Sequence, residues 1–391
     1  MIEKSVWPCF DAEESAAVAE VIQSNRVNYW TGDVGRHFEQ EFADWAGCKY
    51  AVAVANGTLA LDLALKALGI GDGDEVIVTP RTFIASISCV VNAGATPVFA
   101  DVDTDSGNIS AATIQSRITE RTRAIIPVHL AGWPCDMDAI MQLAADHDLK
   151  VIEDCAQAHG ARIGERSVGT IGDVGAWSFC QDKIMTTGGE GGMVTTNDKA
   201  LWSAMWSFKD HGKSWEAVYE REHPPGFRWV HESFGTNWRM LEVQAAIGRL
   251  QLGRMKAWTA RRTRIARRLA TAIAPFETAF RVPLPSGEIR HAFYRLYAYV
   301  RPEGLARGWT RDRVVTTLQA AGVQVLHGTC SEVYLEKAFE GTSLRPAERL
   351  PVARMLGETS LMFLTHPTMG DEELDRAVAA IGRVMSDATA E

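Results

Sequence analysis

The sequence lacks the patterns that mark several common protein classes. Its seven cysteines form no CxxC pair, so neither a zinc knuckle nor a disulfide framework is supported, and we expect no metal site. No apolar run approaches the roughly 18 residues that span a bilayer. The first 15 residues lack the basic-then-apolar pattern of a signal peptide. These absences, with the unpaired thiols, favour a cytoplasmic protein without a membrane partner.

The chain also has fewer basic than acidic residues. The formal net charge is -9, which argues against nucleic acid as the main partner but still permits a local positive pocket for a small anion. Internal repeats and low-complexity segments are missing too. With 391 residues, the chain is too long for one small core. We therefore expect a large domain over residues 1–250 and a smaller domain over residues 251–391.

Strand and helix signals alternate through the first half of the chain. Short apolar runs predict strands at 50–54, 75–79, 97–102, 124–128, 150–153 and 175–179. Amphipathic stretches predict helices at 11–24, 35–46, 59–68, 83–93, 110–117 and 136–148. Such alternation is typical of an α/β protein with a largely parallel sheet that is covered on both faces.

The pattern changes after residue 196. Residues 206–236 are rich in Trp, Lys, His, Pro and Gly without a clear period, which predicts a long ordered loop whose aromatic content favours a partner surface. A helix follows at 240–273. A smaller α+β unit then contains strands at 295–300 and 323–326, a helix at 310–320 and a closing helix at 371–386.

Two polar sites stand at predicted strand ends. Asn56-Gly57-Thr58 lies between a strand and a helix, where backbone N–H groups bind phosphate well, although a plain helix cap would have the same residues. Asp154 ends a predicted parallel strand, and ligands of open α/β sheets bind at such ends. A buried carboxylate there needs a cation, such as a protonated ring nitrogen, whereas an exposed one would simply cap the next segment.

Three further residues complete a possible cofactor site. Phe83 is placed to stack on a planar ring or to join the core. Asn237 marks the return from loop to helix, where a plain helix N-cap is the alternative. Lys183 lies between a strand and a Gly-rich turn at residues 188–192, where loss of water would make it a nucleophile; most lysines are instead solvated. Together, these are the parts that hold pyridoxal 5′-phosphate (PLP) as a lysine Schiff base.

The motifs resemble those of the DegT/StrS family of PLP-dependent sugar aminotransferases over nearly the whole chain. They read, in order, ANGTLAL, PRTFIAS, PVHLAG, EDCAQAHGA, GAWSF, TTGGEGGM and TNWRMLEVQAAIG. The resemblance implies the PLP-transferase fold type I: a large domain with a mostly parallel seven-stranded sheet flanked by helices, and a smaller C-terminal α+β domain.

The resemblance also implies roles for individual residues. Lys183 is the expected Schiff-base lysine and acid/base, and Asp154 the expected partner of the pyridinium nitrogen. The remaining expected cofactor ligands are Gln157 and Phe83 at the ring, and Gly57, Thr58, Ser178 and Asn237 at the phosphate. Asn237 would come from the neighbouring subunit, which implies an obligatory homodimer with composite active sites.

Contacts to the substrate are less defined by the resemblance. Arg239 and His327 are the candidates, with Lys209 as a further one; a surface position is the alternative for His327 and Lys209. Residues 326–332 depart from the pattern of many members, so the identity of the substrate stays open. His129 and His159 are expected to be structural and near the sheet edge.

The implied reaction moves an amino group from L-glutamate to a keto-sugar, most often a nucleotide-linked keto-deoxy sugar for surface polysaccharide such as O-antigen. Because Lys183 is present, the branch that carries histidine there and performs dehydration is disfavoured. The alternatives are an aminotransferase for a keto-octulosonate or a cyclitol, an aminohydroxybenzoate-type synthase, and a PLP-binding regulator without catalysis.

Overall fold

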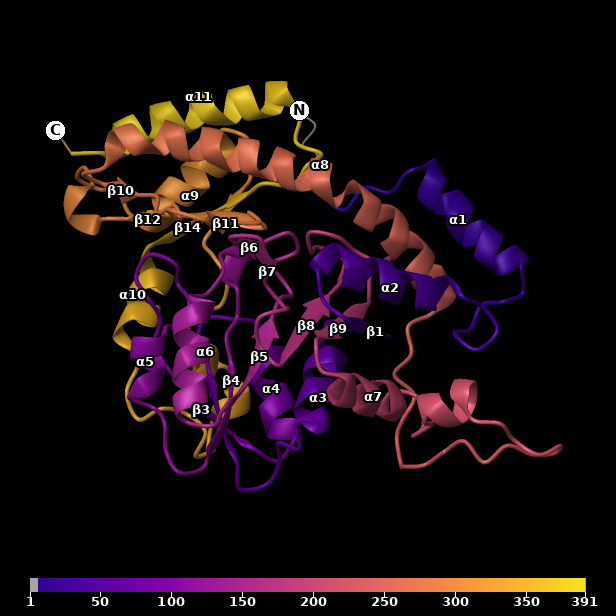
Figure 1. Cartoon of the computed structure of the whole chain (residues 1–391). Coiled ribbons are helices and arrows are strands. Elements are labelled where there is room, and N and C mark those ends of the chain that lie inside the picture. Colours follow the sequence, from indigo (N-terminus) through magenta and orange to yellow (C-terminus); the bar gives the residue numbers. More distant parts are fainter. Residues whose placement is uncertain (1–5, 391) are drawn as a thin grey trace.

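Two regions of the chain share one long helix (Figure 1). The computed structural model describes residues 6–390. Residues 1–5, which open the segment without a signal-peptide pattern, lie outside the described residues, as does residue 391. Across the described part, every helix is too short or too polar to cross a membrane.

A seven-stranded sheet forms the centre of the larger region. Its order is β1 (Tyr50–Val54), β9 (Gly192–Thr196), β8 (Val174–Ser178), β5 (Lys150–Asp154), β4 (Thr122–Ile126), β2 (Glu75–Val78) and β3 (Thr96–Phe99). Neighbouring strands are parallel except around β9, which runs antiparallel to both β1 and β8. The predicted α/β class with a mostly parallel seven-stranded sheet is therefore confirmed.

The apolar strands explain the layers on either side of this sheet. Residues of β2 and β8 are buried throughout, so both faces need cover. The cover comes from α2 (Val34–Ala46), α3 (Gly57–Ala67), α4 (Ala85–Asn92), α5 (Ala111–Gln115), α6 (Met137–Asp146) and α7 (Lys199–Phe208), whereas α1 (Ala12–Gln23) packs against the helix Glu242–Ile273. The parallel arrangement brings the carboxyl ends of β2, β4, β5 and β8 to one edge of the sheet.

The long helix α8 (Glu242–Ile273) joins the two regions. Its first half packs against α1 and α2, and its second half packs against α11 (Asp371–Ala388) (Figure 1). The helix has apolar residues along both halves, which contribute to two separate buried clusters. One continuous helix thus fixes the smaller region against the larger one.

The smaller region is built on a four-stranded antiparallel sheet. Its order is β10 (Phe280–Arg281), β12 (Arg295–Val300), β14 (Ser360–Leu364) and β13 (Val325–Leu326), with α9 (Arg311–Ala320) and α10 (Pro351–Thr359) nearby. A further small sheet joins β11 (Ile289–Arg290) to β6 (Arg162–Ile163) and β7 (Arg166–Ser167). Side chains from residues 333–356 pack into the core of the larger region. The division at residue 250 stays a prediction.

The segment after α7 projects from the body, at the lower right in Figure 1. The predicted loop is largely confirmed, although its first three residues complete α7 and Glu216–Glu220 form one π-helical turn. Phe227, Trp229 and Phe234 of this segment expose most of their surface. The ring centres of Phe227 and Trp229 lie 4.7 Å apart, and exposed apolar side chains that gather in this way are typical of interaction surfaces.

Candidate active site

A cavity of about 570 Å³ opens at the carboxyl ends of β5 and β8. Its wall contains seven of the eight residues that the sequence predicts as cofactor ligands: Gly57, Thr58, Phe83, Asp154, Gln157, Ser178 and Lys183. They come from four separate stretches of the chain. The order of the strands, which the sequence does not reveal, is what brings these stretches together.

Lys183 lies in the wall of this cavity and is not a solvated surface residue. Its side chain is 17% exposed, and its Nζ lies 3.7 Å from Oδ1 of Asp182. The backbone of Lys183 is held at both ends, because its N–H donates to the carbonyl of Cys180 and its carbonyl accepts from Nε1 of Trp7 at 2.7 Å. Gly188 and Gly189, with φ values of 89° and 124°, form the turn behind it.

Asp154 is a buried carboxylate at the end of β5, with 5% of its surface exposed. Its Oδ2 accepts a hydrogen bond from Oγ of Ser86 at 2.7 Å, and its Oδ1 accepts from the N–H of Ala156 at 3.0 Å. Burial raises the pKa of this carboxyl, although the Ser86 hydroxyl opposes the rise. Within residues 6–390, no cationic side chain forms an ion pair with it. A cationic ring nitrogen would supply the missing partner.

Ser86 was not anticipated as part of the site. It lies in the first turn of α4, and its hydroxyl also contacts Oγ1 of Thr82 at 2.9 Å. The two hydroxyls are four residues apart, the spacing at which side chains meet along a helix. That spacing was the signal in the sequence, but it gave no indication that Asp154 would lie beside them.

The amino end of α3 faces Ser178 of β8. Asn56 caps this helix by accepting a hydrogen bond from the N–H of Leu59 at 3.0 Å, so the capping interpretation holds for Asn56. The N–H groups of Gly57 and Thr58 belong to the first turn, where no acceptor exists within the helix. A Cβ on Gly57 would lie 2.5 Å from Cβ of Ser178, so only glycine permits this close approach. The result is a cradle that suits a phosphate group.

Phe83 and Gln157 also line the cavity. Phe83 is 66% exposed, which excludes the core position that was its alternative. Oε1 of Gln157 accepts a hydrogen bond from the N–H of Ala131 at 2.8 Å. Because that contact fixes the amide oxygen, the NH₂ group of Gln157 is left to donate elsewhere.

Three other predicted residues are not brought to the cavity within one chain. Asn237 is exposed and lies outside the cavity wall. Arg239 donates to Oδ1 of the buried Asp210 at 2.7 Å. His327 is half exposed in the smaller region, 3.4 Å from Asp312. The roles predicted for these residues stay predictions.

The expectation for Lys209 is wrong. Neither a substrate contact nor a surface position fits, because its side chain is completely buried. Its Nζ lies 3.6 Å from the centre of the Tyr29 ring and 3.5 Å from Oε1 of Glu39. Burial lowers the pKa of Lys209, while the neighbouring Glu39 opposes that shift. The buried ion pair and the aromatic ring replace the water that this lysine has lost.

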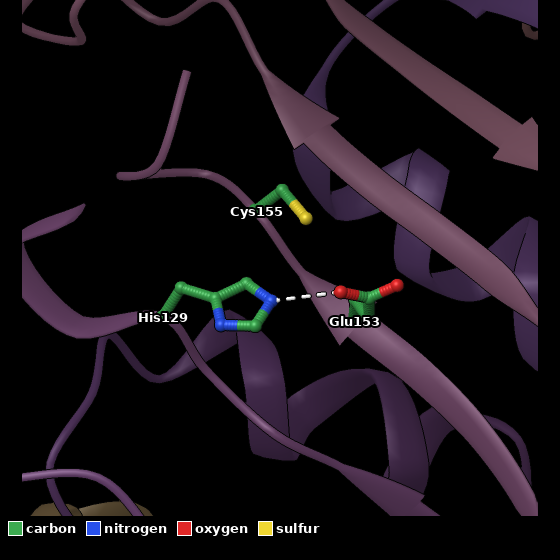
Figure 2. A group of neighbouring side chains, drawn as sticks. All are labelled: His129, Glu153 and Cys155. Carbon is green, nitrogen blue, oxygen red and sulfur yellow. Dashed lines mark hydrogen bonds and ion pairs between the residues drawn. The ribbon is translucent and has the colours of Figure 1, made fainter. Parts of the chain in front are cut away.

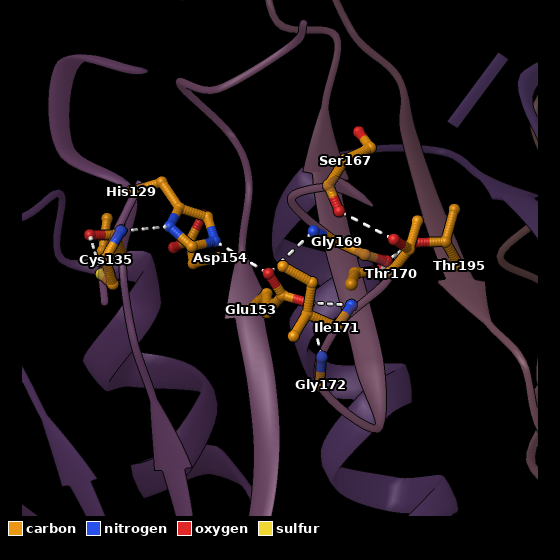
Figure 3. Close-up of polar contacts among 12 residues, drawn as sticks. His129, Cys135, Glu153, Asp154, Ser167, Gly169, Thr170, Ile171, Gly172 and Thr195 are labelled. Atoms are coloured by element: carbon orange, nitrogen blue, oxygen red, sulfur yellow. Dashed lines mark hydrogen bonds and ion pairs between the residues drawn. The ribbon is translucent and has the colours of Figure 1, made fainter. Parts of the chain in front are cut away.

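His129, Glu153 and Cys155 lie close together around the end of β5 (Figure 2). Glu153 accepts hydrogen bonds from the backbone N–H groups of Gly169, Ile171 and Gly172, and from Nε2 of His129 at 3.0 Å (Figure 3). Burial would raise the pKa of Glu153, but His129 and these N–H groups outweigh it and lower the pKa.

The same contacts leave no ligand atom of His129 for a metal ion. Its Nδ1 accepts from the N–H of Cys135 at 3.0 Å, which places the ring proton on Nε2, toward Glu153. The cluster is therefore a hydrogen-bond network that ties the segment before β8 to β5.

His129 and His159 are both completely buried, which confirms their expected structural character. They follow β4 and β5, two interior strands, so they lie at the edge that the carboxyl ends of the strands form and not beside an outer strand. His159 packs against the rings of Trp177 and Phe179, with centroids 5.2 and 5.6 Å away. The two rings shield His159 from water, and contacts with Glu153 and Cys135 enclose His129.

The sheet, the lysine, the buried carboxylate and the helix terminus define the class of the protein. Its fold is that of the PLP-dependent aminotransferases. The chain matches the model of the DegT/DnrJ/EryC1/StrS aminotransferase family over residues 8–382, and it belongs to this family.

Three similar proteins illustrate the relationship. The GDP-perosamine synthase of Caulobacter vibrioides is 38% identical over 384 residues, which cover 97% of each chain. The UDP-N-acetyl-3-dehydro-alpha-D-glucosamine 3-aminotransferase of Acidithiobacillus ferrooxidans is 37% identical, over 92% of this chain and 90% of its own. The crystal structure of an aminotransferase from Psychrobacter cryohalolentis is 60% identical, with a TM-score of 0.97 over 98% of this chain and 99% of that chain.

Proposed function

We propose that this aminotransferase uses PLP to transfer an amino group from L-glutamate to a nucleotide-linked keto-sugar, in the synthesis of a surface polysaccharide. The observation that carries the proposal is Asp154, a buried carboxylate without a cationic partner in residues 6–390, in the same cavity as Lys183. The sugar-nucleotide names of the relatives support the class of acceptor.

The cavity has a place for each part of the cofactor. The N–H groups of Gly57 and Thr58 and the hydroxyl of Ser178 would hold the phosphate. Asp154 would pair with the ring nitrogen, Phe83 would cover the ring, and Gln157 would donate a hydrogen bond to it. When bound, PLP supplies an electron sink for the carbon that carries the amino group.

In this proposal, the amine of Lys183 transfers the protons. Its amine would take a proton from the donor carbon and return one to the cofactor carbon, and the reverse in the second half-reaction. The anchored backbone fixes where the side chain starts, while the cavity leaves its Nζ free to move. Ser86 keeps the carboxylate of Asp154 oriented by its hydrogen bond.

A second copy of the chain would complete the site. Asn237 points to this arrangement because it is exposed in one chain, beside the projecting segment that carries Phe227, Trp229 and Phe234. Those aromatic side chains suit a protein interface. In the dimer, Asn237 would reach the phosphate of the partner's cofactor, and Arg239 and His327 would contact the acceptor.

The lysine assignment is tested by trapping. After incubation with PLP and reduction with borohydride, peptide mass spectrometry should find the cofactor on Lys183. The variant Lys183→Ala should lose the adduct, the visible absorption of lysine-bound cofactor and essentially all transamination, whereas exposed Lys199→Ala should keep all three. A retained adduct in Lys183→Ala would contradict the assignment.

The acceptor is tested with a panel. Labelled glutamate would be offered with nucleotide-linked keto-sugars, a keto-octulosonate and a keto-cyclitol, and products would be identified by mass spectrometry. We expect label only in the nucleotide-linked amino sugars. Transfer to another acceptor alone would replace the proposed substrate, and no conversion of glutamate at all would point to a regulator without catalysis.

A further inference from the structure

Beside Lys183, the smaller region contributes an arginine that no catalytic role has used so far. Arg295 begins β12 and is 12% exposed on its side chain. Its guanidinium lies 3.5 Å from Oδ2 of Asp182, the residue directly before the cofactor lysine. The same carboxylate lies 3.7 Å from Nζ of Lys183 through its other oxygen. One carboxylate thus links the two cations.

Tyr294 holds this group in place. Its hydroxyl donates to Oδ2 of Asp182 at 2.5 Å, and its carbonyl accepts from Arg295 at 2.9 Å. The Arg295 guanidinium stacks on its ring at 3.9 Å, and Nζ of Lys183 lies 5.5 Å from the same ring centre. Because a stacked arginine is fixed in direction, it is ready to bind a planar anion.

A second arginine lies close to Arg295. Arg262 of α8 is completely buried near Arg295, under the ring of Trp7 at 5.1 Å, and its guanidinium has no hydrogen-bond partner among residues 6–390. Burial, then the charge of Arg295, lowers the pKa of Arg262 to about 9, so it is still charged at neutral pH. Asp182 is the one carboxylate among these groups, and half of its side chain faces solvent.

We propose that Arg295 binds the α-carboxylate of the amino donor, and that Asp182 occupies the place of that carboxylate until the donor binds. The inference rests on the proposed function and names the residue that would select the donor. The α-carboxylate is bonded to the carbon that Lys183 must reach, so it has to lie close to Nζ. The diphosphate of a sugar nucleotide is separated from its keto carbon by ring atoms and would lie farther away.

Binding of glutarate to the PLP-loaded protein tests this inference. Glutarate carries two carboxylates but no amine or keto group, so calorimetry reports recognition without reaction. We expect Arg295→Gln to weaken binding about ten- to a hundredfold, as for loss of a charge-assisted hydrogen bond, and Arg295→Lys to weaken it less. Arg290→Gln, an exposed arginine on β11, is the matched control and should bind like the wild type.

Asp182→Asn separates recognition from a structural role. Removing the competing charge should tighten glutarate binding, whereas damage to the site would weaken it. In rapid kinetics, Arg295→Gln should raise the apparent KM for glutamate and leave the half-reaction from the amino sugar unchanged.

Equal glutarate binding in Arg295→Gln and wild type would overturn the proposal, as would no binding to the wild type. An equal slowing of both half-reactions would also overturn it, and would indicate a positioning role or a contact with the diphosphate. These outcomes are distinct from failure of the proposed function, because the borohydride adduct on Lys183 reports that separately.

Discussion

At the scale of single residues, His159 shows how closely the site is packed. Neither of its ring nitrogens has a hydrogen-bond partner among residues 6–390, and the rings of Trp177 and Phe179 pack against it. Burial lowers its pKa from 6.5 to about 3. A histidine with a depressed pKa is neutral in the folded protein and takes up a proton more readily when unfolded. The contribution of neutral His159 to the free energy of unfolding is therefore complete above pH 6.5, and it declines as the pH falls toward the pKa of the folded state.

The lowered pKa of His159 predicts how the stability of the protein depends on pH. Between pH 8 and pH 5, protonation of the unfolded state should cost about 2 kcal/mol at His159. The variant His159→Phe should therefore lose less thermal stability over that range than the wild type, as measured by calorimetry in a single cofactor state. His37→Gln, at an exposed histidine, serves as control. Melting curves of His159→Phe that fall in parallel with the wild type would exclude this account.

The residues of the site could largely be predicted from the sequence, since each lies where a strand gives way to a helix or turn. Gly57, Phe83, Asp154 and Lys183 all fall into one cavity. Ser86, Tyr294 and Arg295 could not be predicted, because their roles depend on contacts across 68 to 113 residues that no local pattern records. Lys209 was misjudged for the same reason: its burial by Tyr29 is a long-range contact.

At the scale of elements, Glu153 connects β5 to the segment that leads into β8. Three backbone N–H groups of that segment and one histidine point at a single buried carboxylate. Because β8 ends in Ser178, this network also holds the phosphate cradle in register. A neutral side chain of the same size could not accept all of these hydrogen bonds.

We expect Glu153→Gln to lower the free energy of unfolding by about 3–5 kcal/mol, because the amide would set an NH₂ group against N–H donors and remove a buried charge from its partners. Chemical denaturation checks this against Glu277→Gln, at an exposed position in the smaller region. If both substitutions cost the same, the network contributes little to stability.

The sequence predicted the ends of helices where a capping residue marks them, and it missed elements where no such residue separates them. Asp11, Asn56 and Thr310 each cap a helix that was predicted within two residues. By contrast, α10 runs directly into β14, because Ser360 ends the helix and starts the strand. Without a glycine or proline between them, neither element was predicted.

At the scale of the whole molecule, the proposed composite site makes a prediction about mixed dimers. A dimer that pairs Lys183→Ala with Asn237→Asp would have one site with both defects and one intact site. Isolated through two affinity tags, it should recover about half the wild-type activity, although each variant alone is inactive.

The matched control pairs Lys183→Ala with Asp154→Ala. Both residues line the cavity of one chain, so each site of this mixed dimer keeps a defect and no activity should return. Light scattering should find the wild type as a dimer. A monomer, or no recovery in the first pair, would refute the composite site.

The continuity of α8 has a mechanical consequence. The helix is 32 residues long, about 48 Å, and contains no proline, although Gly248 and Gly253 lie in its first half. It holds Arg262 and supports β12, which carries Arg295, while its other end is clamped by α1 and α2. One continuous helix thus connects the smaller region to the larger one. In the proposed donor site, this continuous connection would limit how far Arg295 moves relative to Lys183, so the helix itself would contribute to the choice of donor.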